Sequence, residues 1–328
     1  MWLFNPNIGR MKAKGDIPGL AKALGHKEQK IRSEAMEALV EIGEPAVESL
    51  TETLERAETD LRERAARTLG KIGSAQAKES LVRALQDKYS NVREEAVEAL
   101  GTYLDERLSD HLVQALKDSN WRVRNKAALA LDELSWVPSD ATERAYYWIA
   151  KKEWAVLAGL GEAAVEPLIQ ALDLSEVTSD AALTLGKIRD PRAIEPLIRH
   201  MGGEMEVAAW ASPVVQSFGA RLAVFTATAL VRLGRPAIAP LIQALGEEDA
   251  HTRSGAILAL AGMGELAVGP LTQALGSGNE LVRTSAAEAL EQIGAAPGAK
   301  RVCPKCGSEM GPEKRFCTQC GTKLDSEG

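Results

Sequence analysis

Hydrophobic positions recur along most of the chain at the spacing of helical faces. In "AIAPLIQAL" (residues 237–245) apolar residues stand at i, i+3, i+4 and i+7 from Ile238, and in "VREEAVEAL" (residues 92–100) they stand at i, i+4, i+7 and i+8 from Val92. This spacing is typical of an amphipathic helix, whereas a half-buried strand would alternate at every second residue. The pattern therefore predicts an all-α architecture over most of the chain.

Two kinds of helical segment alternate and repeat. One kind opens with an arginine, and Arg32, Arg62, Arg93 and Arg124 follow one another at steps of 30, 31 and 31 residues. The other kind, of which "AVEPLIQAL" (residues 164–172) is an example, stands between them. Each repeat is therefore a helix pair. Because one pair cannot cover its own apolar face, successive pairs are expected to stack into an α-solenoid with a continuous core.

The repeats predict about nine units. Their approximate bounds are 16–43, 44–73, 74–104, 105–135, 138–161, 162–188, 189–234, 235–264 and 265–294. A glycine follows the second helix of six units, where a left-handed residue can end a helix: Gly43, Gly73, Gly161, Gly234, Gly264 and Gly294. Residues 1–15 are expected to form an N-terminal cap on the solenoid.

The repeat unit resembles the HEAT-like repeats of the phycobilisome-lyase type. The resemblance rests on "IGEPAVESL", "LGKIRDPRAIEPLI" and "VREEAVEALG", and it covers residues 16–294. In HEAT repeats an aspartate in the turn commonly bonds the arginine that opens the second helix. The resemblance therefore implies that Asp87 pairs with Arg93 and Asp118 with Arg124, each six residues apart. We interpret the arginines near the start of the second helices, here called the arginine column, as structural.

All four cysteines of the chain lie near its C-terminal end, as Cys303, Cys306, Cys317 and Cys320. Two Cys-x2-Cys pairs, each followed by glycine, supply the four thiolates of a closed tetrahedral zinc site. Disulfides and a redox Cys-x2-Cys are the less favoured alternatives. The sequences "CPKCG" and "CTQCG" resemble small zinc ribbons, so we predict one structural Zn²⁺ in residues 303–324, joined to the solenoid by a linker at 295–302. Such a ribbon could be a docking module or a cap on the last unit.

Composition narrows the range of partners. The 328 residues carry a formal net charge of −7, and aromatic residues make up only 4% of the chain. An acidic body disfavours nucleic acid and favours a protein or peptide partner with a basic surface. No apolar run is long enough for a transmembrane helix or the core of a signal peptide. We therefore expect a cytoplasmic protein without a membrane partner.

Two irregular segments are candidate partner-binding sites. Residues 136–154 concentrate aromatic side chains, and residues 202–219 enlarge the seventh unit, so that Leu185 and Leu230 lie 45 residues apart. Aromatic rings bury large areas at little entropic cost and are good anchors for a peptide. The alternatives are that the rings fill a wider gap between helices and that the insertion is a tolerated surface loop or an extended helix. The candidate anchors are Trp136, Tyr146, Tyr147, Trp148, Trp154, Trp210 and Phe218.

The resemblance also brings two enzymes into consideration. Deoxyhypusine hydroxylase uses His-Glu dyads that hold iron, but the four histidines here are followed by Lys, Leu, Met and Thr: His26, His111, His200 and His251. Bilin attachment, the lyase activity, has no compact motif that the sequence could test. We therefore predict a non-enzymatic interaction scaffold that binds its partner on the concave face, which the second helices are expected to line. An enzyme of the HEAT-like family is the alternative.

Overall fold

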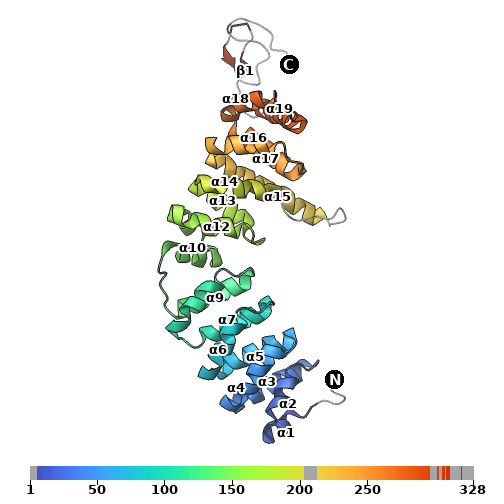
Figure 1. Ribbon diagram of the computed structural model, residues 1–328, viewed down its shortest axis with the longest axis vertical. Helices are drawn as coiled ribbons and strands as arrows, with labels where there is room; N and C mark the ends of the chain where they lie inside the picture. Colours follow the sequence, from blue (N-terminus) through green and yellow to red (C-terminus); the bar gives the residue numbers. More distant parts are fainter. Residues whose placement is uncertain are drawn as a thin grey trace. The chain divides into compact units, whose positions relative to one another are not determined.

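The computed structural model describes residues 6–202, 213–295, 301–302, 305–306, 308–310 and 319 (Figure 1). It divides into two compact units, Met1–Glu153 and Trp154–Gly328. Among the described residues, no helix is both long enough and apolar enough to cross a membrane.

The first unit is a stack of helix pairs. Its helix α1 (Ile8–Ala13) precedes four pairs and the single helix α10 (Ala141–Ala150). The pairs are α2 (Ile17–Ala23) with α3 (Gln29–Ile42), α4 (Val47–Arg56) with α5 (Thr59–Ile72), α6 (Lys78–Ala84) with α7 (Ser90–Gly101), and α8 (Ser109–Ala115) with α9 (Trp121–Glu133). The described part of this unit confirms the prediction of an all-α solenoid built from helix pairs.

The second unit repeats the same architecture. It begins with α11 (Trp154–Leu160) and continues through α12 (Val165–Ala171) with α13 (Thr178–Ile188), α14 (Ile194–Gly202) with α15 (Pro213–Leu233), α16 (Ile238–Ala244) with α17 (Ala250–Met263), and α18 (Glu265–Ala274) with α19 (Glu280–Ala295). Two short strands follow, β1 (Arg301–Val302) and β2 (Glu309–Met310). The boundary between the units falls inside the predicted pair at residues 138–161, because α10 belongs to the first unit and α11 to the second. The predicted bounds of the N-terminal cap, the solenoid, the linker and the zinc ribbon stay predictions.

The enlarged seventh unit is partly described. Helix α14 continues through Gly202, and α15, which has 21 residues, begins at Pro213. Residues 203–212, which include Trp210, lie outside the described residues. Phe218 lies within α15, but its side chain is outside the described part of the structure. The prediction that these two residues anchor a partner is therefore untested.

Glycines end several second helices, as the sequence predicts, but not all with the same geometry. Gly73 is left-handed, with φ 68° and ψ 22°. Gly43 has φ 71° but ψ −134°, a conformation open mainly to glycine, and it both ends α3 and begins the 3-10 turn η1 (Glu44–Ala46). Gly294 does not end its helix, because α19 continues to Ala295. The expectation of a helix end at Gly294 was wrong.

Small residues allow successive second helices of the first unit to approach closely. A Cβ atom added to Gly70 of α5 would lie 2.6 Å from the Cβ of Ala99 in α7. One added to Gly101 of α7 would lie 2.8 Å from the Cβ of Ala130 in α9. Second helices pack against one another more extensively than first helices do. Glycine and alanine at these positions therefore set how closely the second helices of this unit pack.

Candidate interaction surface and zinc site

A groove runs along the second helices of the first unit. One hollow of about 380 Å³ lies between α5 and α7, and another of about 390 Å³ lies between α7 and α9. Glu98 and Thr102 line both hollows, so the two form one continuous α5–α7–α9 groove. Two exposed leucines, Leu104 and Leu129, line the end of the groove beside α9. Apolar side chains exposed on the rim of a groove are typical of a binding surface.

The close helix packing shapes this groove. Its floor is formed by the small residues Gly70, Ala99, Gly101 and Ala130, and longer side chains from the three helices form its walls. A helix pair with large residues at these positions would hold its neighbour further away. The glycine and alanine positions therefore define both the packing of the unit and the depth of the groove.

Charges in the groove are arranged by helix. Arg67 of α5 binds Glu95 of α7, with an Nε–Oε2 distance of 2.9 Å, and this hydrogen bond raises the pKa of the arginine. Lys126 of α9 binds Glu98 of α7 at 2.8 Å. Burial raises the pKa of Glu94, which lies on α7 beside the other two glutamates. Helix α7 is thus an acidic strip between two helices that carry cations.

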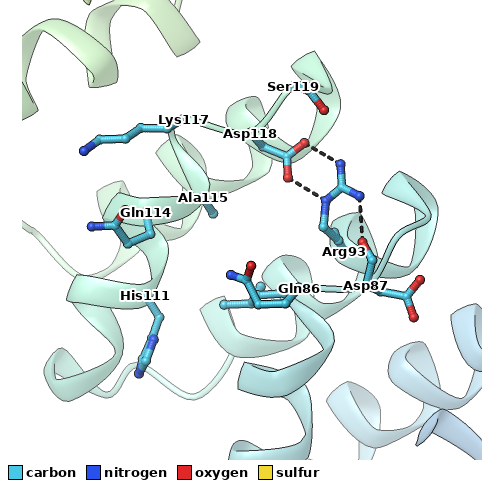
Figure 2. A pocket seen from close by; sticks show the side chains of 10 residues that line it. Gln86, Asp87, Arg93, His111, Gln114, Ala115, Lys117, Asp118 and Ser119 are labelled. Carbon is cyan, nitrogen blue, oxygen red and sulfur yellow. Dashed lines mark hydrogen bonds and ion pairs between the residues drawn. The ribbon is translucent and has the colours of Figure 1, made fainter.

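A separate hollow, of about 420 Å³, lies beside the turns that join first to second helices (Figure 2). His111 and Gln114 of α8, with Lys117 in the turn that follows, form one side of it. On the other side, Arg93 donates to the backbone carbonyl of Asp87 at 2.8 Å and makes two hydrogen bonds to the carboxylate of Asp118. Its cation is therefore already paired within the fold.

The arginine column follows a different rule from the one that the resemblance implied. Arg93 bonds the carboxylate of Asp118, 25 residues later, and Arg62 likewise pairs with Asp87 in the next repeat at 2.9 Å. Within its own repeat, Arg93 contacts only the backbone carbonyl of Asp87, and Arg124 contacts the carbonyl of Asp118. The predicted partners within a repeat are therefore in contact, but the printed bonds run to the backbone carbonyl of the aspartate.

The backbone contact recurs because it needs no particular side chain. The accepting carbonyl lies in the turn, three residues beyond the end of the first helix, and the arginine six residues later reaches it. The same contact is made by Arg32 to His26, by Arg253 to Glu247 and by Arg283 to Ser277, at 2.9, 2.7 and 2.8 Å. In the described repeats the arginine column is structural, and it does not need an aspartate six residues before.

The structure buries one ring of the predicted aromatic cluster and leaves the other four half-exposed. Tyr146 is only 7% exposed, so its ring is core and is not presented to a partner in this structure. Trp136 and Tyr147 are half-buried against the core, with ring centres 6.0 Å apart, and Trp148 meets Tyr147 edge-on at 4.8 Å. Trp154 begins α11 in the second unit. These contacts match the alternative in which the rings fill a gap between helices.

Two exposed rings of the first unit were missed by the sequence analysis. Tyr89 precedes α7 and Trp121 begins α9. Lys88 lies 4.8 Å from the centre of the Tyr89 ring, and Lys152 lies 5.5 Å from the ring of Trp121. Neither aromatic belongs to a sequence cluster, which is why composition did not reveal them. The signal that could have found them is their position at the start of second helices, where α3 and α5 of the same unit carry polar residues.

The cysteine segment is described only in part. Strands β1 and β2 pair antiparallel, with Val302 opposite Glu309, and Cys306 lies exposed in the connection between them. Its sulfur is 2.9 Å from the Ser308 hydroxyl. Cys303, Cys317 and Cys320 lie outside the described residues. A hairpin around the first pair, together with a donor set of four thiols, fits a zinc ion held by these four residues.

The four histidines are dispersed. His26 is buried and accepts a hydrogen bond from the Glu28 amide at 3.1 Å, and His200 lies 3.0 Å from Asp173. His111 and His251 lie exposed on α8 and α17. Within the described ranges, no three His, Cys, Asp or Glu side chains are grouped so that they could hold a metal.

Comparison with known proteins is consistent with this architecture. HEAT repeats match residues 47–132 and 220–291, and the PBS lyase HEAT-like repeat matches residues 179–202. The zinc-ribbon domain matches residues 302–324. No curated protein matches the chain in sequence.

Solved structures align over most of the chain at low identity. Human deoxyhypusine hydroxylase in complex with glycerol is 19% identical over 88% of this chain and 99% of its own, with a TM-score of 0.33. Kap121p is 12% identical over 86% of this chain and 37% of its own, with a TM-score of 0.39. The complex of CpcE and CpcF of phycocyanin lyase from Nostoc sp. PCC7120 is 18% identical over 85% of this chain and 94% of the matched chain, with a TM-score of 0.25. By its sequence matches, the chain is a HEAT-repeat protein that carries a zinc-ribbon domain at residues 302–324.

Proposed function

We propose that the protein is a non-enzymatic scaffold that binds a basic protein segment or peptide in the α5–α7–α9 groove. The observation that carries the proposal is the continuity of the two hollows along α7, with Glu95 and Glu98 in the middle, paired to Arg67 and Lys126, and exposed leucines at one end. The groove lies on the second helices, the side where the sequence analysis expects the partner.

The chemistry of the groove favours a partner that is both basic and apolar. Glu133 and Glu98, the latter paired with Lys126, are exposed carboxylates on its wall, beside Leu104 and Leu129. A lysine or arginine of the partner would meet the carboxylates, and an apolar side chain would cover the leucines. Complementary charge governs the rate and specificity of such an encounter, and buried apolar area supplies most of its affinity.

A charge-reversal experiment tests this location. Fluorescence anisotropy would measure binding of a labelled amphipathic peptide of lysine and leucine to the full chain, and of the same peptide with glutamate in place of lysine. We expect the basic peptide to bind and the acidic one not to bind. The double variant Glu98→Lys/Glu133→Lys should weaken binding of the basic peptide at least roughly tenfold, because it replaces two attractive charges with repulsive ones.

A matched control separates location from net charge. Glu48→Lys/Glu79→Lys makes the same change in net charge on the first helices α4 and α6, where both glutamates are exposed. The control should bind the peptide nearly as well as the unmodified chain. Equal weakening by the two double variants would show that the peptide responds to overall charge, and the groove would lose its support as the binding site.

A further inference from the structure

The last helix pair exposes a position that every earlier first helix buries. The residue that closes the first helix is at most 8% exposed in seven pairs, whereas Leu275 at the end of α18 is 40% exposed. The buried residues of this column are Leu24, Leu54, Leu85, Leu116, Leu172, Met201 and Leu245. In those pairs, the following pair supplies the cover. Leu275 therefore marks the open end of the second unit's stack.

Neighbouring positions show the same difference. Val268 near the start of α18 is exposed, whereas Ile238, its counterpart in α16, is buried. A Cβ atom added to Gly246 would lie 3.0 Å from Val282 of the following pair. One added to Gly276, the counterpart after α18, would meet only the Gln273 carbonyl within 4 Å. Among the described residues, nothing occupies the place where a further pair would lie.

The first unit's stack has a dedicated cover at its N-terminal end. Helix α1 packs against α2 and α3, and its Ile8 is buried there. Lys12 of α1 forms an ion pair with Glu41 of α3. The protein therefore closes its first stack with a segment of its own. The apolar ends of helical repeat arrays need such a cover, because each repeat buries its face only against a neighbour.

We infer that the zinc ribbon, residues 302–324, packs on the end face marked by Val268, Leu275 and Gly276 and closes the second stack. Only residues 296–300 separate α19 from β1. Such a connection spans roughly 20 Å when fully extended. Helix α19, at 16 residues, is about 24 Å long, so the start of the ribbon cannot lie far from this end face.

The ribbon also has the chemistry for this role. It is too short to build a hydrophobic core of its own, and metal binding must supply its folding free energy. Its apolar residues Val302, Met310 and Phe316 can therefore cover another surface once zinc has fixed the chain. Zinc binding at the cysteines is thereby coupled to the stability of α18 and α19.

Hydrogen–deuterium exchange on the full chain tests this coupling. Exchange in peptides from each helix would be measured in the zinc-loaded protein and after zinc removal with a chelator. We expect amides of α18 and α19 to exchange roughly tenfold faster without zinc, the effect of uncovering about one leucine side chain, while α3 and α5 stay unchanged. Equal exchange of α18 and α19 in the two states would overturn the inference.

Two leucine variants of α18 make the test specific to the end face. Leu275→Glu should accelerate exchange of α18 and α19 in the zinc-loaded protein, and zinc removal should then add little. Leu266→Glu changes a similarly exposed leucine that lines a different hollow, between α16 and α18. This variant should keep the full response to zinc. A full zinc response in Leu275→Glu would contradict the inference. So would zinc-independent protection that grows with protein concentration, which would assign the face to a second copy of the chain.

Discussion

The guanidinium of Arg93 holds the carboxylate of Asp118 in the next repeat through two hydrogen bonds of 2.6 and 2.7 Å. Both side chains are mostly buried, at 13% and 11% exposure. Arg62 and Asp87 repeat the arrangement one unit earlier. These pairs join consecutive repeats, so they tie the stack together along its axis.

Removing one partner of this pair should destabilise the first unit. Asp118→Ala leaves a buried guanidinium without its carboxylate and is expected to cost roughly 2–4 kcal/mol of unfolding free energy. Glu52→Ala is the control, because its ion pair with Arg56 is 67–76% exposed and should contribute less than about 1 kcal/mol. Urea unfolding followed by circular dichroism measures both. Equal costs would contradict a bridging role for Asp118.

The close approach of second helices predicts that a Gly→Ala substitution lowers the unfolding free energy at a packed glycine and raises it at an unpacked one. Gly70→Ala places a Cβ atom 2.6 Å from that of Ala99 and should destabilise by roughly 1–3 kcal/mol, because the helices must move apart. Gly269→Ala lies within α18 with no atom in reach of the new Cβ. It should stabilise by about 0.5–1 kcal/mol through helix propensity. Thermal unfolding of the two variants checks the signs, and a stabilising Gly70→Ala would refute the packing argument.

Asp105 should contribute to the acid sensitivity of the protein. Hydrogen bonds from Arg107, and then from Lys78 at 2.7 Å, hold the pKa of this carboxyl well below its usual range. Because its pKa is lowered by folding, its contribution is present above the usual value near ~3.9 and is lost as the pH falls toward the lowered value. Asp105→Asn should therefore lose less stability than the unmodified chain between about pH 4 and pH 2. Urea midpoints across this range measure the difference; parallel curves would show that Asp105 has no such role.

The sequence alone predicts the helix pairs well, because each carries its own hydrophobic period. The segment at residues 92–100 lies within α7, and that at 237–245 contains α16. It could not predict that Arg93 reaches Asp118, because the offset between neighbouring repeats determines which carboxylate lies within reach. The boundary after Glu153 depends on packing between α10 and its neighbours, which no local pattern records.

The same limit applies to the candidate surfaces. The aromatic cluster in the sequence predicted Tyr146 as an anchor, but its side chain is buried. Trp121 is exposed, but it lies outside the cluster and was not predicted. The exposure of a side chain depends on which neighbouring helix covers it, and the repeat pattern does not predict that helix for every position. The groove itself arises from small residues on three different helices, and it becomes visible only when α5, α7 and α9 are stacked.

The most direct test of the proposed scaffold is site-specific photo-crosslinking of the basic peptide to the full chain. A photoreactive residue would replace either Leu129 in the groove or Glu79 on the exposed side of α6, in otherwise identical proteins. The α5–α7–α9 groove predicts a crosslinked product from position 129, reduced by excess unlabelled peptide, and little from position 79. Efficient crosslinking from position 79 with none from position 129 would contradict the account.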